Sequence, residues 1–114
     1  MNTLIIAAVA ALAAQNPEGF TFNLKTMSTQ IGGYAVACKE TQNSFGEDGL
    51  RAVVDYCTAN NDVACIGGWL DQASGLYYYD ATIIVDSLQD AIEIGKLNEQ
   101  IAIFDLNTFQ EVRI

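Results

Sequence analysis

Hydrophobic and polar side chains alternate most regularly between Leu76 and Val85. A period of two predicts a β-strand, because successive side chains of a strand point to opposite faces of the sheet. One face of this strand carries Tyr77, Tyr79, Ala81, Ile83 and Val85, and the other carries Tyr78, Asp80, Thr82, Ile84 and Asp86. Residues 63–70 form a second predicted strand, and the turn-forming residues 71–75 between the two indicate a β-hairpin.

Two other segments have the period of an amphipathic helix. The buried face of the first is predicted to consist of Leu50, Val53, Val54 and Cys57. Ser44 and Glu47 have the spacing of a capping box, so Ser44 is predicted to cap this helix. The second helix is predicted to follow a cap at Ser87 and to bury Leu88, Ala91, Ile92 and Gly95. Gly95 is expected to permit close contact with the sheet, and Asn98 to end the helix in the left-handed conformation.

Four further strands are predicted at residues 20–24, 34–38, 101–104 and 109–114, with a loop at 26–30. Gly67 and Gly68, inside the strand at 63–70, indicate a bulge or a close approach of the backbone. The order is therefore β-β-α-β-β-α-β-β. Its middle is the split β-α-β pattern of ferredoxin-like folds. We expect a single α+β domain over residues 20–114, with two helices on one face of a mostly antiparallel sheet.

An apolar segment, residues 4–14, precedes this domain. It is too short to span a bilayer, which needs about 20 residues. Residues 1–15 are predicted to form a helix with Leu4, Ala8, Ala11 and Leu12 on one stripe, and residues 16–19 to form a linker. Three roles remain open: a retained helix that packs on the domain or on a second copy, a signal peptide cleaved near Ala13 or Ala14, and a peripheral membrane helix.

The charge of the chain limits its partners. Fourteen Asp and Glu residues outnumber five Lys and Arg residues, which gives a net charge of −9. Such a chain is repelled by nucleic-acid phosphates and by anionic membranes, so neither is an expected partner. A basic protein surface is attracted instead.

The residue types that are rare or absent also exclude classes of chemistry. The chain has no histidine, which is the commonest general base and transition-metal ligand. The spacing of Cys38, Cys57 and Cys65 matches no zinc or CxxC motif, so we expect reduced core residues in a cytoplasmic protein, or an exported one if residues 1–14 are a signal peptide. No motif predicts a cofactor, a metal or an enzymatic activity.

The hairpin carries the densest group of candidate site residues. Trp69 and Asp71 share one face of the first strand, and Tyr78 and Asp80 share one face of the second. Antiparallel pairing is expected to bring the four together as a patch for a cationic or ring-shaped ligand or a basic peptide. The alternatives are a cross-strand aromatic pair with solvated acids, or carboxylates that perform acid/base work or hold a divalent ion.

A second candidate site lies at the start of the first amphipathic helix. Gln42, Asn43 and Ser44 precede free backbone N–H groups that could hold an anion. The alternative is that Ser44 only caps its own helix.

Several segments carry a resemblance to a group of proteins. They are residues 33–37 (GYAVA), 41–46 (TQNSFG), 67–71 (GGWLD), 78–80 (YYD) and 98–106 (NEQIAIFDL). In these segments the chain resembles small uncharacterised proteins encoded by phages and mobile elements of bacteria. The resemblance covers residues 19–114, implies a host-directed accessory protein and supplies no catalytic residues.

Two functional hypotheses follow. The first is a non-enzymatic interaction protein that binds a basic partner protein or self-associates through residues 4–14. The second is a small-molecule-binding domain that uses the face of Trp69 and Tyr78 or the helix start at Ser44.

Overall fold

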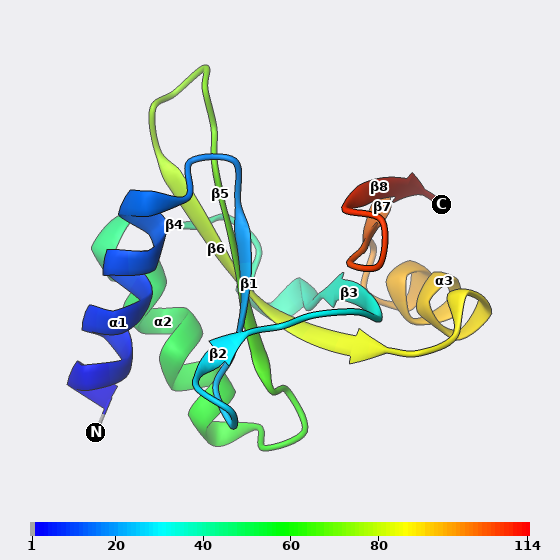
Figure 1. Ribbon diagram of the computed structural model, residues 1–114, viewed down its shortest axis with the longest axis horizontal. Coiled ribbons are helices and arrows are strands. Elements are labelled where there is room, and N and C mark those ends of the chain that lie inside the picture. Colours follow the sequence, from blue (N-terminus) through cyan, green and yellow to red (C-terminus); the bar gives the residue numbers. More distant parts are fainter. Residues whose placement is uncertain (1) are drawn as a thin grey trace.

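The computed structural model describes residues 2–114 and has the α+β architecture shown in Figure 1. Its helices are α1 (Asn2–Gln15), α2 (Gly46–Ala59) and α3 (Leu88–Leu97), with a short 3₁₀ turn, η1, at Lys39–Thr41. Its strands are β1 (Phe20–Asn23), β2 (Ser28–Thr29), β3 (Tyr34–Ala37), β4 (Ser44–Phe45), β5 (Cys65–Leu70), β6 (Tyr77–Val85), β7 (Ala102–Asp105) and β8 (Gln110–Arg113). The predicted α+β class and antiparallel sheet are therefore confirmed.

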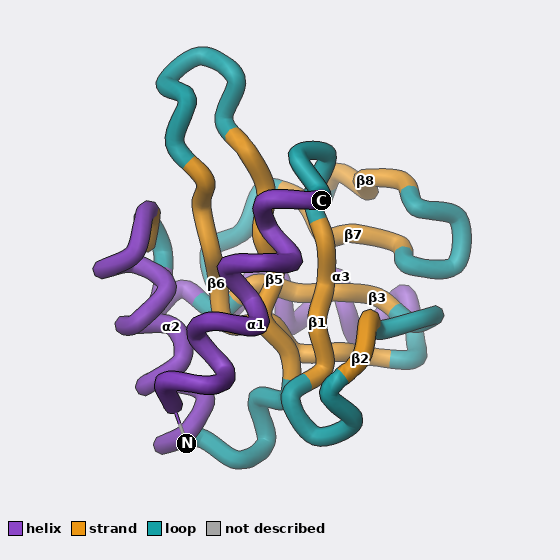
Figure 2. The backbone as a smooth tube through the Cα atoms, turned by 60° about the vertical axis from the view of Figure 1, so that its left-hand side comes forward, coloured by secondary structure: helices purple, strands orange, loops and turns teal. Residues whose placement is uncertain are grey.

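All the strands belong to one antiparallel sheet in the order β2-β1-β5-β6-β3-β7-β8. The long strand β6 is its centre: β5 pairs along one edge, and β4 and then β3 pair along the other. The sheet is curled into a half-barrel, a shape that the sequence pattern did not predict. Figure 2 shows the β5–β6 hairpin extending past the rest of the sheet.

The three helices lie on one face of the sheet. Alternation along β6 puts Tyr79, Ala81, Ile83 and Val85 on this face. The helices α1 and α2 cover it over β1, β5 and β6, and α3 covers it over β3 and β7. The fully buried residues of the larger core are Val9, Leu50, Val53, Val54, Ile66 and Ala81. We call this side the helix face and the opposite side the open face.

The stripe predicted for α1 is wrong. Ile6, Val9 and Ala13 are the buried residues of this helix, whereas Leu4 is 75% exposed. The helix is apolar on every side, so its periodicity gave no reliable indication of which residues face α2. Its end is fixed by Tyr77, whose Oη donates a 2.7 Å hydrogen bond to the carbonyl oxygen of Asn16.

The capping box predicted at Ser44 is not formed. Ser44 belongs to β4 and pairs with Tyr79, and its Oγ donates to the carbonyl oxygen of Thr41 at 2.8 Å. The helix begins later because Gly46, at φ +68°, turns the chain out of the strand. Glu47 forms an exposed ion pair with Arg51 instead of reaching back to Ser44.

Other local predictions have mixed outcomes. The cap at Ser87 is confirmed, because its Oγ accepts from the backbone N–H of Asp90. The left-handed residue after α3 is Glu99 (φ +59°) rather than Asn98, whose side chain donates to the carbonyl oxygen of Ile94. Part of the loop predicted at 26–30 is the short strand β2, because Ser28 and Thr29 pair with β1.

Close packing was predicted at Gly95, and a bulge or a close approach of the backbone at Gly67 and Gly68. An ideal Cβ at Gly95 would lie 2.6 Å from Ile114 Cδ1, which agrees with the close contact predicted there. At Gly67 and Gly68 the register between β5 and β6 is continuous, so no bulge is present. Instead, side chains approach these two glycines closely from opposite faces.

Candidate functional site

A groove of about 320 Å³ on the open face brings the two predicted groups of site residues together. One wall comes from the segment after β3, with Gln42 and Asn43, and the other from the β5–β6 hairpin. The residues on which the site depends are Gln42, Asn43, Trp69, Asp71, Tyr78 and Asp80. Ser44 lies outside this groove and lines a separate hollow at the start of α2.

The groove exists because the chain leaves the sheet between β3 and β4. At this point η1 replaces strand pairing, and Thr41 contacts β6 through its side chain. Its Oγ1 accepts a 2.9 Å hydrogen bond from the N–H of Ala81, and the N–H of Cys38 donates to the carbonyl oxygen of Ala81 at 2.8 Å. These bonds satisfy the backbone groups of Ala81 in β6, while residues 41–43 form a wall beside Asp80.

Aromatic rings form the outer part of the site. Trp69 and Tyr78 are cross-strand partners whose rings stack at a centroid distance of 5.1 Å and an interplanar angle of 15°. Phe45 adds a tilted ring 5.5 Å from Tyr78. Trp69 is 47% exposed, so the ring stack presents aromatic surface to solvent instead of filling the core.

Asp80 is the acidic centre of the groove. Its Oδ1 accepts a 2.5 Å hydrogen bond from Thr82 Oγ1 and lies over Gly67, where an ideal Cβ would be only 2.8 Å away. Burial raises the pKa of the Asp80 carboxyl above its ordinary value, and the hydrogen bond from Thr82 opposes part of this rise. Among residues 2–114 no Lys or Arg forms an ion pair with Asp80. Asp80 is therefore half-buried rather than fully solvated.

Asp71 has a different role at the rim. Its Oδ1 accepts from the N–H of Ala73 at 3.2 Å, and its Oδ2 accepts from Ser74 Oγ at 2.8 Å. These bonds hold the turn of the hairpin. Within the described residues, no group of three or more Asp, Glu, Cys or His side chains could hold a metal ion.

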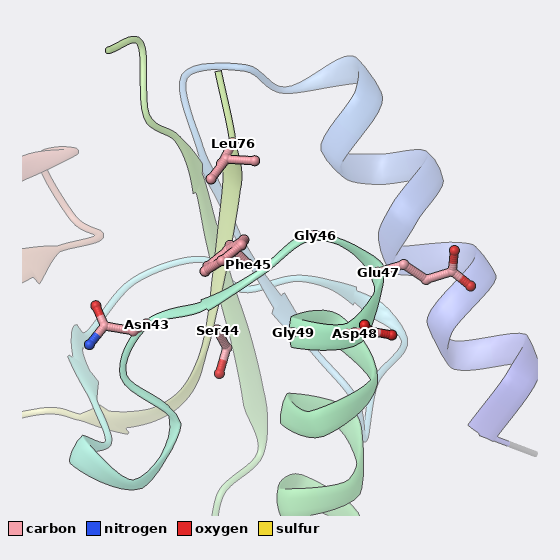
Figure 3. A pocket seen from close by; sticks show the side chains of 8 residues that line it. All are labelled: Asn43, Ser44, Phe45, Gly46, Glu47, Asp48, Gly49 and Leu76. Atoms are coloured by element: carbon pink, nitrogen blue, oxygen red, sulfur yellow. The ribbon is translucent and has the colours of Figure 1, made fainter. Parts of the chain in front are cut away.

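The hollow at the start of α2, whose lining side chains are shown in Figure 3, is the larger of the two at about 690 Å³ and is open to solvent. Glu47 and Asp48 occupy the first turn of the helix and already place negative charge near its positive end. A second anion would be repelled there. The geometry around Asn43 and Ser44 thus gives little support to the predicted anion site.

Sequence reasoning did not identify Thr41, Gly67, Thr82 or Gln100 as parts of the site. Gln100 reaches the groove from the segment after α3, which no local pattern could reveal. Thr82 was detectable, because it lies two residues after Asp80 on the same face of a strand. The sequence marks Gly67 as a bulge or a close approach of the backbone, but does not identify it as the strand partner of Asp80.

The three cysteines are buried and free. Burial raises the pKa of the Cys38 and Cys65 thiols to about 11 and that of Cys57 to about 12. Thiols of this kind remain protonated and are poor nucleophiles near neutral pH. They therefore act as small core residues.

Two observations concern the whole described chain. No helix within residues 2–114 has the length and apolar character needed to cross a membrane. Comparisons with protein-family models, with curated proteins and with solved structures found no match.

Proposed function

We propose that this chain is a non-enzymatic binding protein that accepts a cationic side chain of a basic partner protein in the groove around Asp80. The observation that carries the proposal is the environment of this carboxyl group. It is half-buried, accepts a hydrogen bond from Thr82 and forms no ion pair with the described Lys and Arg residues. A lysine or arginine of a partner would supply the missing charge.

The surroundings of Asp80 suit a cation in two further ways. The exposed stack of Trp69 and Tyr78 offers aromatic faces, to which ammonium and guanidinium groups are attracted within about 6 Å of a ring centre. The net charge of −9 would steer a basic protein toward the chain. The same charge supports the proposal that nucleic acids and anionic membranes are not direct partners.

We also propose that four strands form a split β-α-β core. The support is their neighbouring order, β5-β6-β3-β7, and the positions of α2 before β5 and of α3 between β6 and β7. A host-directed accessory role, suggested by the resemblance to phage-encoded proteins, would fit a small acidic binding domain. A cytoplasmic location is part of the same proposal.

Self-association through residues 4–14 has less support than binding of a partner in the groove. The most buried side chains of this segment, Ile6, Val9 and Ala13, already pack within the core of the same chain. Its exposed residues include Leu4 and several alanines, and nothing else in the fold indicates what would cover them.

The second candidate function is binding of a small cationic molecule. The volume of about 320 Å³ favours this alternative, because it is close to the lower end for small-molecule pockets. If a free amine or guanidine binds in the groove with the same affinity as a basic peptide, the result would support a small molecule as the ligand. Tighter binding of the peptide would support the protein partner.

The test uses Trp69, the single tryptophan of the chain, as a reporter inside the site. We expect an Arg/Lys-rich peptide to change the fluorescence of Trp69. We expect Asp80→Asn to weaken binding of the peptide about tenfold or more, because the cationic group of the peptide in the groove then loses its charged partner. Calorimetry with the same peptide gives an independent measure of affinity.

Glu93→Gln is the matched control, because it removes one negative charge from the exposed side of α3. It should change affinity only slightly. Equal weakening by Asp80→Asn and Glu93→Gln would show that the peptide senses net charge alone, and the groove would lose its proposed role.

A further inference from the structure

The outer edge of β8 is a free strand edge. Within the described chain, β8 pairs only with β7. The N–H of Ile114 donates to the carbonyl oxygen of Ile101 at 3.1 Å, so Ile114 directs its backbone groups toward β7. The direction of the backbone N–H and C=O groups alternates from residue to residue along a strand. Those of Val112 therefore also point toward β7, whereas those of Glu111 and Arg113 point outward.

The side chains at this edge carry opposite charges. Glu111 and Arg113 project from the same face of the sheet and form an exposed ion pair, with Arg113 Nε 3.3 Å from Glu111 Oε1. Val112, between them, lies half-buried on the other face, in the core under α3. A second β8 strand that runs antiparallel to the first and is centred on Val112 therefore places an opposite charge beside each of these two side chains.

We propose that β8 pairs antiparallel with β8 of a second copy of this chain, around a two-fold axis at Val112. In this register Glu111 lies opposite Arg113 of the second copy, and Arg113 lies opposite Glu111. These are the residues whose backbone groups point outward, so both N–H and C=O groups of each pair can bond across the interface. The two sheets then become one continuous sheet.

The charges also select this register. A shift in one direction places Arg113 opposite Arg113, and a shift in the other places Glu111 opposite Glu111, and like charges directly opposite are destabilising. The sheet's other edge strand, β2, is only two residues long and offers no comparable surface. This assembly uses neither the groove nor α1, so it stands independently of the proposed function.

The experiment is sedimentation equilibrium of the full chain and of charge-reversal variants. We expect a reversible dimer. Arg113→Glu or Glu111→Arg alone should weaken it roughly tenfold or more, because by symmetry each substitution places like charges opposite at two positions. The double variant Glu111→Arg/Arg113→Glu should restore most of the association, because the opposite pairs are re-formed.

The control variants are Arg51→Glu and Glu47→Arg, which make the same changes in net charge at an exposed ion pair on α2. They should leave the dimer nearly unchanged. Circular dichroism checks that each variant folds. Glu111→Pro is a second probe, since it removes an outward N–H and should abolish pairing without breaking a bond to β7.

The proposal would be overturned by a chain that stays monomeric at high concentration, by a double variant that remains as weak as the single ones, or by equal weakening from Arg113→Glu and Arg51→Glu. A dimer that is insensitive to all of these substitutions would place the interface elsewhere and would also overturn it.

Discussion

The two faces of β6 are built from one alternating sequence but are buried in different ways. On the helix face, Tyr79 and Ala81 pack against α2 among apolar side chains. On the open face, Thr82 is only 2% exposed although no helix covers it; its strand partner Cys65 is buried beside the side chain of Gln30. The helix face is therefore closed by apolar packing, whereas the open face relies on local hydrogen bonds and keeps a groove.

The adjacent glycines of β5 show the same contrast at the scale of one residue. Gly68 leaves room on the helix face for the rings of Phe20 and Tyr77, which stack at 6.0 Å. Gly67 leaves room on the open face for the carboxyl of Asp80 and the hydroxyl of Thr82. One glycine serves apolar packing and the other serves the proposed site.

The largest effect is expected from truncation of the helix-face core. Leu50 is 1% exposed, so Leu50→Ala should reduce the free energy of unfolding by about 2–5 kcal/mol. Trp69→Ala on the open face should cost about 1 kcal/mol, the contribution of an aromatic pair, while binding of the basic peptide is lost. Urea unfolding followed by circular dichroism measures both. A loss from Trp69→Ala as large as that from Leu50→Ala would make Trp69 a core residue.

A smaller effect is expected from adding one methyl group to each glycine. Gly68→Ala would force its Cβ against the packed rings of Phe20 and Tyr77, and should destabilise the fold by about 1–3 kcal/mol. Gly67→Ala meets the Asp80 carboxyl and the Thr82 hydroxyl, which can rotate away. It should therefore cost less stability but weaken binding of the basic peptide. Denaturant unfolding and peptide titration of both variants check the comparison, and the reverse pattern would contradict it.

The sequence predicted the parts of the fold that depend on local periodicity. The alternation in β6 and the buried face of α2 were readable because each repeats one spacing over several residues. The cap at Ser44 was wrong for a non-local reason: Ser44 pairs with Tyr79, and this contact delays the helix. The turn η1 was also hidden, because it depends on the hydrogen bond between Thr41 and Ala81 across the sheet.

The sequence predicted the residues of the candidate site as two separate groups, without indicating that the groups lie together. Trp69, Tyr78 and Asp80 could be grouped from the hairpin alone, since cross-strand neighbours follow from the turn. Gln42 and Asn43 were assigned to a separate anion site, because nothing in their local sequence indicates that β4 pairs with β6. The curl of the sheet arises from the packing of all the strands together, so no local pattern indicates it.

The smallest effect is expected from pH and concerns the open face alone. Because burial raises the pKa of Asp80, the folded chain keeps a proton just above the ordinary aspartate pKa, where the unfolded chain has already released it. This proton stabilises the folded chain fully at pH values below the Asp80 pKa of the unfolded chain. The stabilisation is lost as the pH rises through the Asp80 pKa of the folded chain. Asp80→Asn has no such loss, so its stability relative to the natural chain should increase from acidic to neutral pH. Urea unfolding at several pH values measures the difference, with Glu93→Gln as the control. A difference independent of pH would mean that water surrounds the Asp80 carboxyl as fully as in the unfolded chain, and the groove would then lack the desolvated charge that should attract a cation.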